Sequence, residues 1–199
     1  MTVESFEHTG QPDWDWWGRL WPAPGETLRD LGVEAGDSVA EVGCGNGYFA
    51  LPAARIAAPA PVYAVDVDES LLAELETLAD RQGVETLHPV RGDARSLGDV
   101  LPEPVDRVIL ANAFHGVDDR GRVVRAAAEA LAPGGQFVVV NWAARPRAET
   151  TVLGEPRGPP TDCRLSPDET RAAVEGVAGF TERAHVSLPP YHYALRFER

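Results

Sequence analysis

Short apolar runs alternate with amphipathic segments along most of the chain, a pattern that predicts strands followed by helices. The best helical segment is 69–82, where Leu71, Leu72, Leu75 and Leu78 recur on one side. Predicted strands cover 38–42, 62–67, 85–90, 105–111 and 136–142, and the helices between them cover 46–57, 69–82, 96–101 and 119–131. Such alternation favours a mostly parallel sheet covered by helices on both faces.

The rest of the chain gives weaker patterns. A short helix is predicted over 26–31, and 143–165 is predicted as a long, proline-rich irregular connection. Ser166, Pro167 and Glu169 have the spacing of a capping box that starts a helix reaching about residue 177. The final hairpin is predicted over 181–188 and 192–198. Without an internal repeat or linker, we expect one domain over 1–199, with an N-terminal segment (1–25), a core (26–142) and a C-terminal part (143–199).

Four tryptophans lie in the first 22 residues, which lack clean periodicity: Trp14, Trp16, Trp17 and Trp21. Tryptophan is large and apolar, so this cluster is expected to cover another part of the molecule. Two interpretations stay open. The side chains cap the hydrophobic edge of the sheet, or Trp14, Trp17 and Trp21 line a substrate pocket.

The composition narrows the possible partners and locations. The formal net charge of −13 argues against nucleic acid, because phosphate binding depends on clustered basic side chains. There is no lysine, and all 18 basic residues are arginine. This acidic, lysine-free composition resembles that of proteins from extreme halophiles; a high-GC genome is the alternative. No apolar stretch is long enough for a membrane span and no signal peptide is recognisable, so a cytoplasmic location is expected.

Metal and disulfide chemistry have little support in the sequence. Its two cysteines, Cys44 and Cys163, are too few for a disulfide framework and lack the spacing of a zinc site. We therefore predict no metal. The oligomeric state cannot be read from the chain.

The strongest local motif follows the first predicted strand. Glu41 is followed by Gly43, Gly45 and Gly47, in the order acid-x-G-x-G-x-G. Glycines at a strand-to-helix turn let the chain adopt positive φ angles and let a ligand approach the main chain. A dinucleotide fingerprint, G-x-G-x-x-G, would need glycine at Tyr48. The motif thus predicts a cofactor loop of another kind.

This motif resembles the first motif of the class I S-adenosylmethionine-dependent methyltransferases, and residues 131–135 resemble the turn before that family's fifth strand. The resemblance covers about residues 26–142. It implies a doubly wound, mostly parallel, Rossmann-like seven-stranded sheet with a C-terminal antiparallel hairpin, and S-adenosyl-L-methionine as cofactor. Binding residues follow at the predicted strand ends. The full set is Glu41, Gly43, Cys44, Gly45, Asn46, Gly47, Asp66, Val67, Asp93, Ala94 and Asn112.

Individual roles also come from the resemblance. Asp66 would accept hydrogen bonds from the ribose hydroxyls, and Asp93 from the adenine amino group. Asn112 would lie beside the methionine part, with Glu41 acting on its amino group. A plain helix cap is the alternative for Asp93.

The acceptor side is less defined. Methyl transfer is an in-line displacement that needs a base only if the acceptor must lose a proton. His115 is the candidate base or orienting residue, and Asn141, Trp142, Tyr191 and His192 are candidates for the acceptor pocket. We expect a small uncharged or cationic metabolite as acceptor, with a protein side chain also possible.

Two other functions stay open. A non-catalytic module that binds S-adenosylmethionine or S-adenosylhomocysteine would use the same binding residues. An NAD-dependent oxidoreductase on a similar sheet is disfavoured by the glycine spacing and the terminal hairpin.

Overall fold

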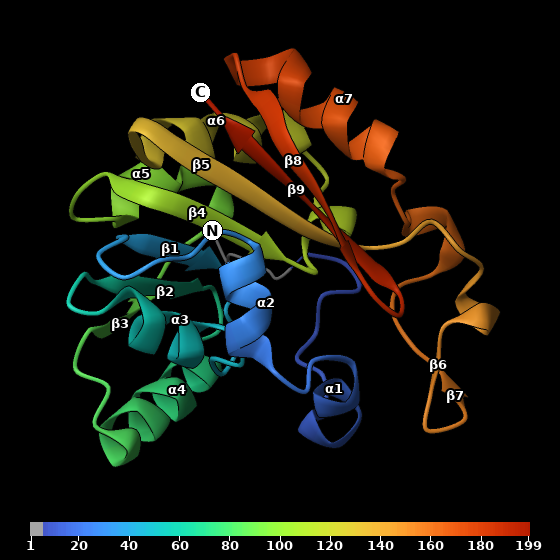
Figure 1. Ribbon diagram of the computed structural model, residues 1–199, viewed down its shortest axis with the longest axis horizontal. Helices are drawn as coiled ribbons and strands as arrows, with labels where there is room; N and C mark the ends of the chain where they lie inside the picture. Colours follow the sequence, from blue (N-terminus) through green and yellow to red (C-terminus); the bar gives the residue numbers. More distant parts are fainter. Residues whose placement is uncertain (1–5) are drawn as a thin grey trace.

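The computed structural model describes residues 6–199, which form a seven-stranded sheet with strand order β3-β2-β1-β4-β5-β9-β8 (Figure 1). The strands are β1 (Val39–Val42), β2 (Val62–Asp66), β3 (Leu87–Arg91), β4 (Val105–Ala111), β5 (Leu131–Trp142), β8 (Thr181–Leu188) and β9 (His192–Glu198). β1 pairs in parallel with both β2 and β4, whereas β9 pairs antiparallel with β5 and β8. This arrangement confirms the predicted fold class and its C-terminal hairpin.

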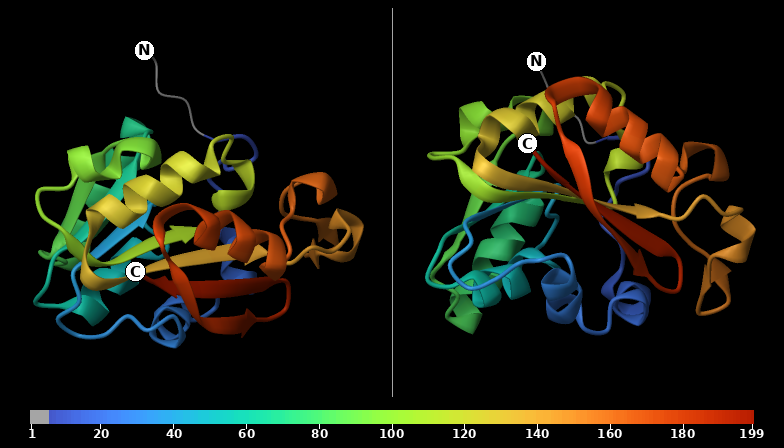
Figure 2. Two further views of the ribbon diagram at one scale, coloured as in Figure 1. Left: turned by 90° about the horizontal axis from the view of Figure 1, so that it is seen from above. Right: turned by 45° about the horizontal axis from the view of Figure 1, so that its top comes forward.

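Helices cover both faces of the sheet (Figures 1 and 2). One face carries α2 (Pro24–Asp30), α3 (Ala50–Ala57) and α4 (Glu69–Gln82), with α1 (Trp14–Leu20) near its edge. The other carries α5 (Leu97–Val100), α6 (Arg120–Ala130) and α7 (Pro167–Ala178). Strand side chains point alternately to the two faces, so the buried residues form one apolar cluster on each side.

Helix boundaries follow local chemistry. α4 has the predicted bounds, with Asp68 accepting from the backbone N–H of Ser70 and Leu71 at its start and Gly83 in the left-handed conformation at its end. α7 begins with the predicted capping box of Ser166 and Glu169. Both helices therefore carry their own start signals in the sequence.

Beyond shifts of one or two residues at the ends of elements, four segments differ from the predictions. β5 begins at Leu131 rather than at residue 136, so residues 131–135, predicted as a turn, belong to the strand. The helix after β1 begins at Ala50 rather than at residue 46, because the turn between them is longer and has positive φ at Gly43, Gly45 and Gly47. The tryptophan-rich segment contains the helix α1. The connection after β5 is not wholly irregular: β6 (Thr151–Val152) and β7 (Glu155–Pro156) form a small hairpin that lies beyond the end of the sheet (Figure 1).

Among residues 6–199, no helix has the length and apolar character needed to cross a membrane.

Candidate active site

A cavity of ≈ 570 Å³ lies at the carboxyl ends of the parallel strands. Its floor comes from the ends of β1, β2 and β4 and from the residues after β3. Residues 8–13, Trp16 and Trp17 from the N-terminal segment contribute another wall, and the connection after β5 contributes a third. The order of the strands changes direction between β1 and β4, the place where ligands bind in open α/β sheets.

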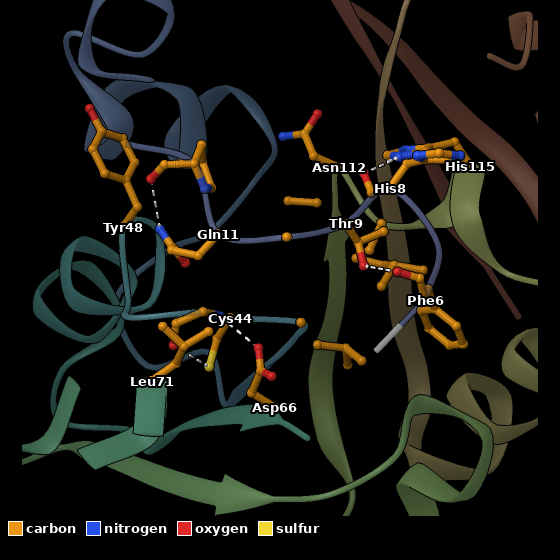
Figure 3. A pocket seen from close by; sticks show the side chains of 18 of the residues that line it. Phe6, His8, Thr9, Gln11, Cys44, Tyr48, Asp66, Leu71, Asn112 and His115 are labelled. Carbon is orange, nitrogen blue, oxygen red and sulfur yellow. Dashed lines mark hydrogen bonds between the residues drawn. The ribbon is translucent and has the colours of Figure 1, made fainter. Parts of the chain in front are cut away.

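The glycine loop forms one side of this cavity and is tied to β2. The backbone N–H of Gly43 donates to the carbonyl of Val65 at 2.8 Å, and that of Gly45 donates to Oδ2 of Asp66 at 2.8 Å (Figure 3). The φ angles of Gly43 and Gly45 are +72° and +54°, a region that favours glycine. At these two positions the loop presents main chain to the cavity, beside the side chains of Cys44 and Tyr48.

Glu41 is a buried carboxylate facing this loop. Its residue is 4% exposed, and Oε2 has no hydrogen-bond partner within residues 6–199. Burial, and secondarily the charge of Asp66, raises the pKa of the Glu41 carboxyl well above its ordinary value. An unsatisfied carboxylate here fits a ligand that brings an amino group or another cation.

Asn112 is the second unsatisfied group. It follows β4 with φ +57°, unusual for a residue with a side chain. Both Nδ2 and Oδ1 are buried, and neither finds a partner in the described part of the chain. Strain and orphaned polar atoms on one residue indicate a place that a ligand completes.

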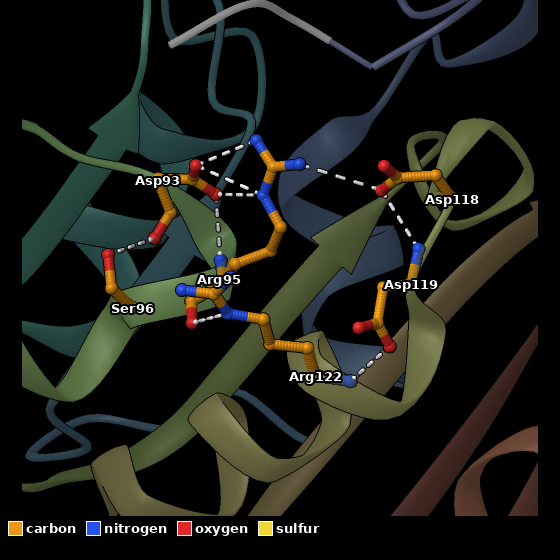
Figure 4. A network of polar contacts seen from close by, with 6 residues as sticks. All are labelled: Asp93, Arg95, Ser96, Asp118, Asp119 and Arg122. Atoms are coloured by element: carbon orange, nitrogen blue, oxygen red, sulfur yellow. Dashed lines mark hydrogen bonds and ion pairs between the residues drawn. The ribbon is translucent and has the colours of Figure 1, made fainter. Parts of the chain in front are cut away.

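Asp93 lies after β3 and lines the cavity, but its carboxylate also makes protein contacts (Figure 4). It accepts from the backbone N–H of Arg95 at 2.8 Å and from the Arg95 guanidinium at 2.8 Å. Burial alone would raise the pKa of Asp93, but the hydrogen bonds and charge of Arg95 outweigh it and lower the pKa. The helix-cap interpretation is thus correct for Asp93, and the cofactor role stays a prediction beside it.

His115 lies on the opposite wall, against the N-terminal segment (Figure 3). Its Nε2 is 3.1 Å from the carbonyl oxygen of His8. A carbonyl can only accept, so the hydrogen is on Nε2 and Nδ1 keeps a lone pair, which is buried and without a partner among residues 6–199. Burial lowers the pKa of His115, so the ring is neutral near pH 7.

The structure brings most of the predicted site residues to the cavity. Those that line it are Glu41, Gly43, Cys44, Gly45, Asp66, Val67, Asp93, Ala94, Asn112, His115, Trp17 and Trp142. Those that do not are Asn46, Gly47, Trp14, Trp21, Asn141, Tyr191 and His192.

The residues outside the cavity have other contacts. Oδ1 of Asn46 accepts a hydrogen bond from the Trp14 indole N–H at 3.0 Å. Gly47 packs against Leu75, and a Cβ at this position would lie only 2.2 Å from Cδ1 of Leu75. Asn141 points to the face opposite Trp142, as neighbours on a strand must, and its Nδ2 donates to Oγ1 of Thr170 at 3.1 Å.

The remaining aromatic candidates belong to the packing behind the cavity. His192 is buried with its ring centroid 4.2 Å from that of Trp142 and 4.6 Å from that of Trp21. The Tyr191 hydroxyl donates to the carbonyl of Thr151 at 3.0 Å. Of the three tryptophans predicted for a substrate pocket, Trp17 lines the cavity, whereas Trp14 and Trp21 do not. Trp17 and Trp21 also pack in the core, and a role in binding a substrate stays a prediction.

Sequence reasoning missed several residues that line the cavity, most of which come from segments without a clear period. These include Phe6, His8, Thr9, Gln11, Trp16, Tyr48, Leu71, Arg147 and Arg157. The Gln11 side chain lies over Gly45 and its Oε1 accepts from the backbone N–H of Asn46 at 3.2 Å. A usable signal existed only for the connection after β5, whose length suggests function.

The glycine loop at the crossover, the acid at the end of β2 and the terminal hairpin define the class I S-adenosylmethionine-dependent methyltransferase fold. The solved structure of a SAM-dependent methyltransferase from Aquifex aeolicus superposes with a TM-score of 0.77 at 20% identity, over 91% of this chain and 92% of that one. The orphaned atoms of Glu41 and Asn112 fit such a cofactor.

The chain belongs to the methyltransferase domain family, whose model matches residues 40–139. A probable cobalt-precorrin-6B C(15)-methyltransferase (decarboxylating) from Methanosarcina mazei is 37% identical over 71 residues, 36% of this chain and 39% of that protein. A tRNA (guanine(6)-N2)-methyltransferase from Thermus thermophilus is 39% identical over 102 residues, 50% of this chain and 30% of that protein. The chain thus matches well under half the length of these curated relatives.

Proposed function

We propose that this protein binds S-adenosyl-L-methionine in the cavity above β1, β2 and β4 and transfers its methyl group to a small molecule. The observation that carries the proposal is the pair of orphaned buried groups, Glu41 and Asn112, beside the glycine loop. Burying an unpaired polar group costs free energy of folding. The presence of both groups where the strand order changes direction therefore supports a polar ligand that forms hydrogen bonds with each.

The chain's residues divide the work of binding. Asp66 accepts from the ribose hydroxyls, Glu41 balances the charge of the amino group, and Asn112 orients the methionine part. The apolar surfaces of Val67 and Ala94 hold the adenine, with Asp93 at its edge. When bound, the cofactor supplies a methyl group on a positively charged sulfur.

The remaining walls of the cavity contribute to methyl transfer itself. The N-terminal segment, Trp16 and Trp17 keep water from the cavity, which favours transfer to the acceptor over side reactions. His115 is the proposed base: it is neutral near pH 7, and its Nδ1 lone pair takes the proton of an acceptor that must lose one.

The acceptor class is part of the proposal. The cobalt-precorrin relative supports a small molecule and the tRNA relative supports RNA. The net charge of −13 disfavours a phosphate backbone, because it repels rather than collects one. The cytoplasmic location expected from the sequence stays a prediction.

The test is transfer of label from methyl-labelled S-adenosylmethionine to a low-mass metabolite extract, compared with transfer to bulk tRNA. We expect label in the low-mass fraction with wild type and with Glu76→Gln, an exposed change on α4, and none with Asn112→Gly. Glycine accepts the φ of +57° at this position, so Asn112→Gly removes the side chain without straining the turn. Label in tRNA alone would contradict the small-molecule proposal.

A further inference from the structure

We infer that the acceptor is a small aromatic carboxylate, held by Arg147 and Arg157 in the half of the cavity beside β5. This inference rests on the proposed function, since it assigns the second substrate of the same cavity. It differs from the uncharged or cationic metabolite expected from the sequence, which stays a prediction beside it.

The charges in the cavity are segregated. Carboxylates gather at the ends of the first three strands and in the N-terminal segment; they are Glu41, Asp66, Asp68, Asp93 and Asp13. Within residues 6–199, the arginines that line the cavity are Arg147 and Arg157, both from the connection after β5. One half of the cavity thus suits a cationic cofactor, and the other suits an anion.

Neither arginine is neutralised by the described part of the protein. The ion pairs among residues 6–199 involve other arginines, although the chain carries 31 acidic residues. Nε of Arg157 is buried without a hydrogen-bond partner. Nε of Arg147 donates to the carbonyl of Gly158 at 3.0 Å, which leaves its terminal nitrogens for a ligand. Other arginines also lack ion pairs, but these two line the same part of one cavity. Two such guanidinium groups indicate a place for an oxyanion, which they bind with paired donors.

A buried third arginine holds this connection in place. Arg164 is 5% exposed and donates to the carbonyl oxygens of Pro159 and Arg157, at 3.1 and 3.0 Å, and to Oγ1 of Thr150 at 2.9 Å. The backbone N–H of Arg157 donates to the carbonyl of Thr150 at 2.8 Å. Burial, and then the charge of Arg147, lowers the pKa of Arg164. The three arginines therefore form a positively charged cluster, and a bound anion would reduce the repulsion among them.

The same half of the cavity has aromatic walls. Trp16, Trp17 and Trp142 line it, and the Arg157 guanidinium carbon lies 5.0 Å from the Trp16 ring centroid. Gly158 packs against Trp142, and a Cβ at this position would lie only 2.7 Å from Cδ2 of the indole. The backbone of the connection therefore approaches the indole closely. Trp17 and Trp142 are nearly buried, so Trp16 offers the accessible aromatic surface. An indole beside two guanidinium groups suits a ligand with an aromatic body and a carboxylate.

The test is calorimetric titration of the S-adenosylhomocysteine-bound protein with matched triplets of probes: the carboxylate, carboxamide and methylamine derivatives of benzene, naphthalene and indole. The variant Arg147→Gln/Arg157→Gln removes both charges. Arg145→Gln is the matched control, because Arg145 is exposed on the same connection and does not line the cavity. A variant that binds S-adenosylhomocysteine with an affinity within twofold of wild type is counted as folded.

We expect at least one carboxylate to bind at least tenfold more tightly than its amide and amine. The double variant should lose at least tenfold of that affinity, and Arg145→Gln less than twofold. Equal binding of the amide or amine, unchanged carboxylate affinity in the double variant, or no carboxylate binding at 10 mM (about the weakest affinity measurable) would each overturn the inference. If wild type fails to bind S-adenosylhomocysteine, the proposed function itself is wrong; if it binds without preferring carboxylates, only this inference is.

Discussion

Oε2 of Glu41 and both polar side-chain atoms of Asn112 are buried and lack partners within the described residues. Leaving such a group unpaired costs about 1–3 kcal/mol, so an interior carries few of them unless a ligand completes them. Both lie on the cavity, at the ends of adjacent strands. At the scale of single residues, these unpaired groups therefore destabilise the ligand-free protein locally, and ligand binding removes this cost.

Glu41→Gln should separate stability from binding. The pKa of Glu41 is raised in the folded protein, so the folded state holds its proton more tightly than the unfolded state. The stability from this proton is present below the ordinary value of 4.5 and is lost as pH rises through the raised pKa. Because glutamine carries no charge, the free energy of unfolding of Glu41→Gln should increasingly exceed that of wild type above pH 4.5, by about 1–3 kcal/mol.

Urea unfolding from pH 4.5 to 8, with Glu76→Gln as the exposed control, measures this difference. The same variant should bind S-adenosylmethionine at least about tenfold more weakly. A Glu41→Gln protein that is less stable than wild type at pH 8 would show that the carboxylate is satisfied in the ligand-free protein.

His115→Asn should slow methyl transfer by about 10²–10⁴-fold if the acceptor must lose a proton. The pKa of His115 is lowered from 6.5, so the neutral base persists through neutral pH and the wild-type rate should fall only below pH 6.5. The pH profile of kcat/KM with the acceptor found by labelling checks this, with His88→Asn on the exposed β3 surface as control. An unchanged kcat in His115→Asn would remove this residue from the chemistry.

At the scale of elements, the β1–α3 turn combines two uses of glycine. Gly45 lines the cavity and makes room for the side chain of Gln11, whereas Gly47 makes room for Leu75 of α4. Both have positive φ and belong to one motif, so the sequence predicted the turn but not this division. The difference depends on which neighbour the fold brings to each position.

Gly47→Ala should cost more stability than Gly36→Ala. Both glycines have φ +92°, so each substitution carries the same conformational penalty of about 1–2 kcal/mol. A Cβ at Gly47 would stand 2.2 Å from Cδ1 of Leu75, but one at Gly36 would meet nothing within 4 Å. The clash should add about 1–3 kcal/mol, measured by urea unfolding. Equal losses in the two variants would show that Leu75 moves aside freely.

Elements with strong periodicity and caps were predictable, and those assembled by tertiary contacts were not. Helix 69–82 and the strands 181–188 and 192–198 have the predicted bounds. The strand-end residues of the site were also predictable, because parallel strands deliver their carboxyl ends to one edge. Arg147 and the 8–13 segment reach the cavity through folded loops that no sequence period encodes.

At the scale of the whole molecule, the excess of negative charge determines how stability depends on salt. With 31 acidic residues, 18 arginines and no lysine, the surface repels itself at low ionic strength. Salt shortens the screening length from about 10 Å at 0.1 M to about 3 Å at 1 M. We therefore predict that Tm rises by roughly 5 °C or more between 0.1 and 2 M KCl. Sorbitol at equal osmolality is the control, and a Tm that stays level or falls with KCl would contradict the expected halophilic character.

We propose that this cavity binds S-adenosylmethionine through Asp66 and the glycine loop. Calorimetric titration of wild type and Asp66→Ala with S-adenosylhomocysteine and NAD, in high salt, tests it most directly. Losing hydrogen bonds to a charged group costs about 1.5–3 kcal/mol, so Asp66→Ala should bind S-adenosylhomocysteine at least tenfold more weakly, with Glu76→Ala unchanged. Binding of NAD without S-adenosylhomocysteine, or equal affinity in Asp66→Ala, would contradict the account.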